Sequence, residues 1–254
     1  MRTKHHHILF AAALVGALLL STPATRAEET NLWSFDVTPY LWVANVDVTT
    51  SLPSVPSVAK SGGGSDFDTR ISGGAMIAAE ARYRSVGLWV DFAWLQLDTE
   101  GTRPGPLYSE VDLKSDFFHT TAALTYRLPL QGKFHADLLA GARIWHVNED
   151  LEFHSGLLPG FKTSGDATWV DPIIGADLRY DISQRWFATV KGDVGGFGVS
   201  SDLAYEVFVG VGFRITDWCS TTLGYRYLYE KYDQDNFKFD LKAQGFLLGF
   251  GFHF

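Results

Sequence analysis

The residues of this chain that could do chemistry are charged side chains at every second position of extended segments. On one parity the acids are Asp36, Glu80, Asp91, Asp137, Asp171, Asp177, Asp193, Glu206 and Glu230. The bases on the same parity are Arg82, Arg84, Arg127, Arg143, Arg179, Lys191, Arg214 and Arg226. Since nine acids accompany eight bases, and an unpaired buried charge is strongly destabilising, we expect these groups to neutralise one another.

Ten of these residues are predicted to form a salt-bridged network inside a narrow barrel. The arginines are Arg82, Arg127, Arg143, Arg179 and Arg226, and the acids are Glu80, Asp137, Asp171, Asp177 and Glu206. We expect arginines to clamp carboxylates of neighbouring strands with paired hydrogen bonds. The individual pairs stay open because the strand register is unknown. The alternative is a small ion- or solute-selective pore, although a lining of one sign would favour that more strongly than this mixture does.

The histidines and serines show no spacing typical of catalysis or metal binding. A serine hydrolase needs Ser beside His with an orienting acid, but His119 shares its face with Thr121. Asp150 and His154 could form a dyad in a long loop, yet no second pair of acids accompanies them. The chain also lacks HxH and HxxxH pairs among its central histidines. We predict no enzyme, metal or cofactor, with a rim-located hydrolase as the weakest alternative.

The elements that position these charges are predicted to be strands. Between residues 203 and 213 every odd position is apolar, and side chains of a strand alternate between its two faces. Ten such segments are predicted, at 33–47, 70–84, 87–98, 112–128, 133–147, 166–181, 185–196, 203–215, 219–231 and 239–254. Short connections alternate with longer ones, which is typical of an up-and-down meander.

The N-terminus has the organisation of a secretory signal peptide. Arg2 and Lys4 precede an uninterrupted apolar run at 8–20, and small residues lead to a cleavage site after Ala27. Thirteen apolar residues are too few for a membrane-spanning helix, which needs about 20. We therefore predict a signal peptide at 1–27 and a barrel domain at 28–254.

Two architectures place an apolar and a polar face on alternating strands. A soluble sandwich or barrel would turn the apolar face inward, and a transmembrane barrel would turn it toward lipid. Mid-strand charges favour the membrane barrel, as do aromatic residues near strand ends, where interfacial girdles lie. Those residues are Trp33, Trp94, Trp169, Trp186, Trp218, Tyr83, Tyr126 and Tyr180. The expected fold is all-β: a closed antiparallel up-and-down transmembrane β-barrel of ten strands.

The last strand supports the same fold and carries a resemblance. Phe250, Phe252 and Phe254 share one face, and the chain stops at Phe254. Together with the signal peptide and the meander, this strand resembles the small Gram-negative outer-membrane barrels of the opacity-protein and OmpA-like porin superfamily. Segments 186–197 and 223–227 look like segments of superfamily members whose molecular activity is not known. The resemblance implies that the three phenylalanines are the signal read by the barrel-assembly machinery. Small members often have eight strands, so an eight-stranded barrel stays the alternative.

The expected function follows from this location. We predict a monomer exported through the periplasm to the outer membrane of a Gram-negative bacterium, in contact with lipid and lipopolysaccharide. Its role would be structural in the envelope or a surface interaction, with a narrow porin as the alternative. A net charge of −8 argues against nucleic acid as a partner. Segment 148–165 mixes acids with Leu157, Leu158 and Phe161, and is expected to be a contact surface or a lid.

Overall fold

The computed structural model describes residues 32–51, 60–61, 67–102, 107–234 and 237–254. The predicted signal peptide at 1–27 lies outside the described residues, as does the start of the predicted domain at 28–31. Within the described part of the chain, no helix is long and apolar enough to cross a membrane.

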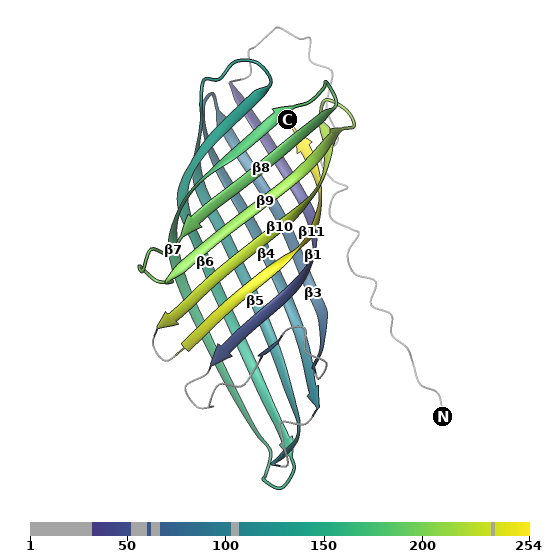
Figure 1. Cartoon of the computed structure of the whole chain (residues 1–254), viewed down its shortest axis with the longest axis vertical. Coiled ribbons are helices and arrows are strands. Elements are labelled where there is room, and N and C mark those ends of the chain that lie inside the picture. The colour runs from purple at the N-terminus through teal and green to yellow at the C-terminus, as the bar shows by residue number, and fades with distance from the viewer. Residues whose placement is uncertain (1–31, 52–59, 62–66, 103–106, 235–236) are drawn as a thin grey trace, which may run out of the picture. The chain divides into compact units, whose positions relative to one another are not determined.

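The described residues form one antiparallel sheet that closes on itself (Figure 1). Its strands are β1 (Trp33–Ser51), β2 (Lys60–Ser61), β3 (Phe67–Tyr83), β4 (Val86–Thr102), β5 (Tyr108–Arg127), β6 (Phe134–Ser155), β7 (Phe161–Asp181), β8 (Trp186–Gly195), β9 (Leu203–Arg214), β10 (Cys219–Gln234) and β11 (Phe237–His253). Consecutive barrel strands pair, with β3 next to β1, and β1 pairs with β11 to close the barrel. β2 is a short addition to β1. The predicted fold of ten barrel strands is confirmed, and the eight-stranded alternative is wrong.

The two ends of the barrel differ in strand length. Short connections at 84–85, 128–133, 182–185 and 215–218 define one end, which we call the short-turn end. At the other end β5, β6 and β7 have 20, 22 and 21 residues, whereas β8 and β9 have 10 and 12. A barrel strand needs about 9–11 residues to cross a bilayer. The longer strands therefore extend past the rest of the barrel, at what we call the projecting end (Figure 1).

The outer surface carries an apolar belt near the short-turn end. On β6, Leu138 and Ile144 are exposed on the outside, and on β9 Val207, Val209 and Val211 are. Beyond the belt the pattern reverses along the same strands. On the projecting part of β6, Leu151 and Phe153 are buried inside, while Asp150 lies exposed on the outer face. The outer face of this strand is thus apolar within the apolar belt, and its inner face is apolar between the belt and the projecting end.

Aromatic residues border the belt. Trp33, Trp186, Trp218, Tyr83, Tyr126 and Tyr180 are exposed at the short-turn end. On the other border, the Trp94 indole donates a hydrogen bond to Asp116 Oδ1 over 2.7 Å. The prediction for Trp169 is wrong, because this residue lies on the inward parity of β7 and is buried inside the barrel.

Segment 148–165 is neither an irregular loop nor a lid. Most of it continues β6 and β7, which pair as far as Phe153 and Phe161. The turn between them is held by a hydrogen bond from the Leu158 amide to the Leu107 carbonyl, 3.0 Å long. The β6–β7 hairpin therefore continues the wall of the barrel at the projecting end.

Candidate functional site

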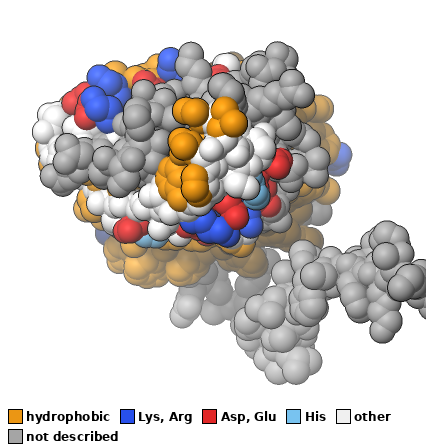
Figure 2. Space-filling model, turned by 90° about the horizontal axis from the view of Figure 1, so that it is seen from below, with side chains coloured by type: hydrophobic (Ala, Val, Ile, Leu, Met, Phe, Trp, Pro, Cys, Tyr) orange, Lys and Arg blue, Asp and Glu red, His pale blue; other side chains and the backbone are white. Residues whose placement is uncertain are grey.

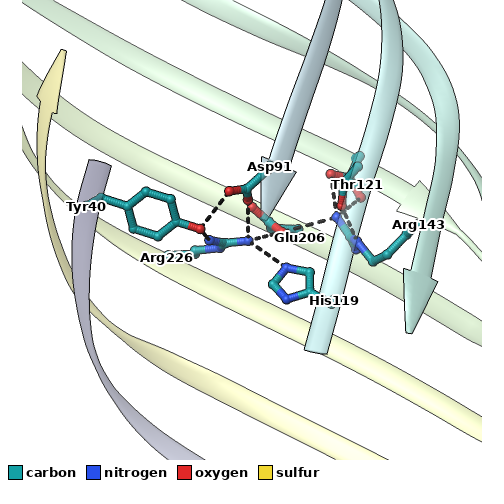
Figure 3. A network of polar contacts seen from close by, with 8 residues as sticks. Tyr40, Asp91, His119, Thr121, Arg143, Glu206 and Arg226 are labelled. Carbon is teal, nitrogen blue, oxygen red and sulfur yellow. Dashed lines mark hydrogen bonds and ion pairs between the residues drawn. The ribbon is translucent and has the colours of Figure 1, made fainter. Parts of the chain in front are cut away.

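Arg226 of β10 is the centre of a buried charge network in the middle of the barrel (Figure 3). Its Nη2 atom donates to Asp91 Oδ2 at 2.9 Å and to Glu206 Oε2 at 2.8 Å. Its Nη1 atom donates to the Tyr40 hydroxyl at 2.8 Å, and that hydroxyl donates to Asp91 Oδ1 at 2.7 Å. The guanidinium is thereby paired with two carboxylates, as a buried cation requires.

Arg143 of β6 extends the network across the barrel. It donates to both oxygens of Asp193 at 3.0 Å, to Glu206 Oε2 at 3.1 Å and to the Thr121 hydroxyl at 2.9 Å. Glu206 therefore bridges the two arginines. The charge belt, as we call it, consists of Tyr40, Asp91, His119, Thr121, Arg143, Asp193, Glu206 and Arg226. These residues come from seven strands, so the belt joins opposite walls of the barrel.

An apolar core lies on the side of the charge belt that faces the projecting end. We call it the plug; its buried members are Val48, Val111, Leu113, Phe117, Trp145, Val147, Leu151, Phe153, Trp169, Leu228, Tyr232, Phe239, Leu241 and Ala243. His119 of the charge belt stacks on Trp145 with ring centroids 4.9 Å apart. Trp145 in turn stacks on Trp169 at 5.8 Å, and Trp169 on Tyr232 at 4.4 Å. The charge belt and the plug are therefore in direct contact.

The side chains of these two layers are buried. Arg143 is 0% exposed, Trp145 is 2% exposed and Trp169 is 3% exposed. The side chains that line a water-filled channel would be accessible to water. The interior from the charge belt to the projecting end is thus packed, apart from a cavity of about 50 Å³ lined in part by Phe117, His119 and Trp145.

The interior next to the short-turn end is open. A cavity of about 520 Å³, which we call the vestibule, lies between the charge belt and the short-turn end. Arg82 donates to the Asp137 carboxylate from Nη2 at 3.0 Å and from Nη1 at 3.3 Å. Arg127 donates to the same carboxylate from Nη2 at 2.9 Å and from Nε at 3.0 Å. Arg214 and Arg179 both contact Asp181, at 2.6 and 3.4 Å. Ion pairs therefore line the walls of the vestibule without filling it.

The structure distributes the ten predicted network residues over three levels. Glu80, Arg82, Arg127, Asp137, Asp177 and Arg179 surround the vestibule, Arg143, Glu206 and Arg226 belong to the charge belt, and Asp171 lies beside the plug. Arg179 bonds Asp181 rather than an acid of the predicted set. Asp171 bonds Ser201 and Asp177 bonds Thr189. The charges thus form two networks, and two of the acids pair with hydroxyl groups.

The uncharged partners of the charge belt were missed by reasoning from charge alone. Tyr40, His119 and Thr121 complete the hydrogen bonds of the two arginines. His119 and Thr121 do lie on the inward parity of their strand, which is the signal that could have indicated them. The partners themselves depend on the register, which the sequence does not provide.

Arg226 also accounts for a group of metal-type ligands. Atoms of Asp91, His119 and Glu206 lie within 4.8 Å of one another. The Arg226 Nη2 atom contacts all three, with His119 Nε2 at 3.3 Å. The guanidinium therefore supplies the cation at this point.

The suggested loop dyad is not formed. His154 Nε2 contacts Asp112 Oδ2 of β5 at 2.8 Å, whereas Asp150 lines a groove together with Lys114 and Lys162. At the other end, Phe250 and Phe254 are exposed on the outer face. The backbone of Phe254 exchanges two hydrogen bonds with Phe35 of β1.

Three solved structures are similar to this chain at low sequence identity. The structure is similar to the attachment invasion locus protein Ail of Yersinia pestis, with 13% identity over 87% of this chain and 98% of that chain, and a TM-score of 0.35. It is similar to the outer membrane protease OmpT of Escherichia coli, with 9% identity, 91% and 99% coverage, and a TM-score of 0.45. It is also similar to the toluene transporter TodX of Pseudomonas putida, with 11% identity, 87% and 89% coverage, and a TM-score of 0.39.

A search of curated proteins gives no match. The family model described as the outer membrane protein beta-barrel domain matches residues 10–254. That range includes every strand of the closed barrel. The chain therefore belongs to the outer membrane protein β-barrel domain family.

Proposed function

We propose that this protein is a non-conducting barrel of the outer membrane, and that its projecting end is a surface for contacts outside the cell. The observation that carries the proposal is the sealed interior. The charge belt joins opposite walls, and the plug packs directly on it through His119 and Trp145. A solute leaving the vestibule would have to separate buried ion pairs and then displace an aromatic core.

The orientation follows from the lengths of the connections. Barrels of this class have short turns in the periplasm and longer segments outside the cell. The short-turn end would then open the vestibule to the periplasm, and β5 to β7 would stand above the outer leaflet. Lipid and lipopolysaccharide would surround the apolar belt. Export of a monomer through the periplasm, with cleavage after Ala27, belongs to the same proposal.

The projecting end has the surface of a contact site. Leu107, Leu157, Leu158 and Phe161 are exposed there, and Leu157 is 77% exposed. Phe161 stacks on Phe153 of the plug at 4.5 Å, so this patch has a rigid support. Figure 2, seen from this end, shows apolar side chains gathered next to acidic and basic groups. Contiguous exposed apolar patches that are bordered by polar residues mark interaction sites.

Conductance in a planar bilayer tests the sealed interior. We expect no stable openings from the folded protein. Replacing Trp145 and Trp169 together by Ala removes two stacked indoles from the plug and should produce a leak. The matched control replaces Trp186 and Trp218, which are exposed on the outer surface, and should stay silent.

The opposite result would favour the alternative function. Stable nanosiemens openings from the unaltered protein would mean that the charge belt opens in the membrane. The protein would then be a narrow porin, and the charged groups of the belt would be its selectivity filter.

A further inference from the structure

We propose that Ser220, His253 and Asp36 form a nucleophilic triad that hydrolyses small carboxylic esters in the vestibule. This activity goes beyond the proposed function, because a sealed barrel needs no such group. The three residues line the vestibule, and none of them belongs to the charge belt or the plug.

The barrel closure brings the triad together. Asp36 of β1 lies directly opposite His253 of β11, and Ser220 of β10 lies directly opposite Gly251. Gly251 and His253 share one face of β11, because side chains alternate along a strand. The three groups therefore converge on the inner wall where the first and last strands of the barrel meet.

Each ring nitrogen of His253 has the partner that nucleophilic catalysis requires. Ser220 Oγ lies 2.9 Å from Nε2, and Nδ1 is hydrogen bonded to Asp36 Oδ1. A carboxylate on Nδ1–H fixes the tautomer whose Nε2 accepts a proton. Nε2 is then placed to take the hydroxyl proton as the serine oxygen attacks.

Gly251 keeps the space beside the nucleophile open. A methyl group at this position would come within 2.9 Å of Ser220 Oγ and 3.4 Å of His253 Nε2. The vestibule, at about 520 Å³, lies in the usual range of about 300–1,000 Å³ for small-molecule sites. Ser220 is 4% exposed and lines this cavity, from which an ester carbonyl would reach its hydroxyl.

The lining of the vestibule indicates the class of ester. Its carboxylates are Asp36, Glu80, Asp137, Asp177 and Asp181, against three arginines of the lining and Arg82, which pairs with Glu80 and Asp137. Those arginines are held by Asp137 and Asp181. The excess of carboxylates favours a neutral or cationic substrate over an anionic one. The rings of Trp89 and Phe187 also line the vestibule, and the cations of Lys191 and Arg179 lie against them.

The reaction is a two-step acyl transfer to water. Ser220 Oγ bonds to the carbonyl carbon while its proton passes to His253 Nε2. The ester C–O bond breaks, the alcohol leaves with that proton, and the acyl group stays on Ser220. Water then attacks the acyl-serine with help from His253, releasing the carboxylic acid and restoring the hydroxyl. Thr222, two residues along β10, also lines the cavity, and its hydroxyl would donate to the oxyanion. Arg214 lies opposite Ser220 on β9, where it is bonded to Asp181 and to the Gln184 carbonyl.

The test uses a neutral fluorophosphonate on the folded, full-length protein. We expect one covalent adduct, located by mass spectrometry on Ser220, and slow hydrolysis of p-nitrophenyl acetate. Ser220→Ala should abolish both. His253→Gln should slow labelling about 100-fold, the usual contribution of a general base. Heat-dependent gel mobility verifies that each variant is folded.

Two matched controls separate the triad from a serine that is merely accessible. Ser183→Ala removes another serine hydroxyl, at an exposed turn of the same end, and should leave labelling unchanged. Gly251→Ala should block labelling, whereas Gly249→Ala, on the same face of the same strand, should not. The proposal is overturned if the folded protein gives no Ser220 adduct, or if His253→Gln labels at the unaltered rate.

Discussion

Glu206 accepts hydrogen bonds from Arg143 and Arg226 with a single oxygen, at 3.1 and 2.8 Å. Glu206→Gln should lower the free energy of unfolding by about 3–5 kcal/mol, because removing one partner of a buried pair leaves uncompensated charge. Urea titration followed by gel mobility measures this change. The control is Glu152→Gln, whose partner Lys162 is 74% exposed. An exposed pair contributes about 1 kcal/mol or less. Equal losses of unfolding free energy in the two variants would therefore mean that the charge belt is hydrated.

His154 gives the projecting end a response to pH. The hydrogen bond to Asp112 raises the pKa of His154 above its ordinary value of 6.5. A raised pKa means that the charged contact is complete below about pH 6.5 and is lost as the pH rises through the raised value. NMR titration of the His154 ring should show this pKa falling in Asp112→Asn and unchanged in Asp150→Asn. An identical titration in Asp112→Asn would exclude Asp112 as the cause.

At the residue scale, the sequence indicates which side chains face inward but not which ones pair. Alternation places Arg143, Glu206 and Arg226 on the inner face. Their actual partners include Tyr40 and Asp193, which are distant in sequence, so they depend on the register of several strands. The triad was missed for the same reason. Ser220 and Asp36 lie on strands near opposite ends of the sheet, and the closure of the barrel joins them.

At the element scale, strand limits were predicted well at one end of the barrel and poorly at the other. For β6 the predicted segment was 133–147, and the strand is Phe134–Ser155. The short-turn end agrees because a turn interrupts a clear alternation there. At the projecting end the sequence pattern indicates a loop, because the apolar residues change from the outer to the inner face of the strand. A pattern that reverses within one strand loses its periodic signal.

A pair of arginine substitutions on β6 tests where this reversal occurs. Leu138→Arg places a charge on the lipid face and should destabilise the barrel by about 2–4 kcal/mol. Asp150→Arg changes the same outer face twelve residues further along, above the belt, and should have little effect. Urea titration in lipid vesicles compares the two free energies of unfolding. Equal losses would place Asp150 in the membrane as well.

At the scale of the whole molecule, the closing strand can be tested apart from the stability of the closed barrel. The Phe254 side chain is exposed on the outside, while its backbone is hydrogen bonded to Phe35. Phe254→Ala keeps those backbone bonds, so the purified barrel should unfold at nearly the same urea concentration. If the side chain is an assembly signal, the amount of folded protein in the outer membrane of cells should fall. Trp218→Ala, exposed at the same end, is the control, and equal yields from both variants would argue against the signal.

The reversal of the apolar face also limits the thickness of bilayer that this barrel can match. On β5 the outward residues from Phe118 to Tyr126 are apolar except Thr120, and Asp116 ends them. Nine residues inclined by about 40° span about 23 Å along the membrane normal. A thicker hydrocarbon layer would reach the acids of the projecting sheet, so the lipids around the barrel would have to compress or those acids would have to leave water. The bacterial outer membrane is thinner than average, and the sequence of β5 is matched to that dimension.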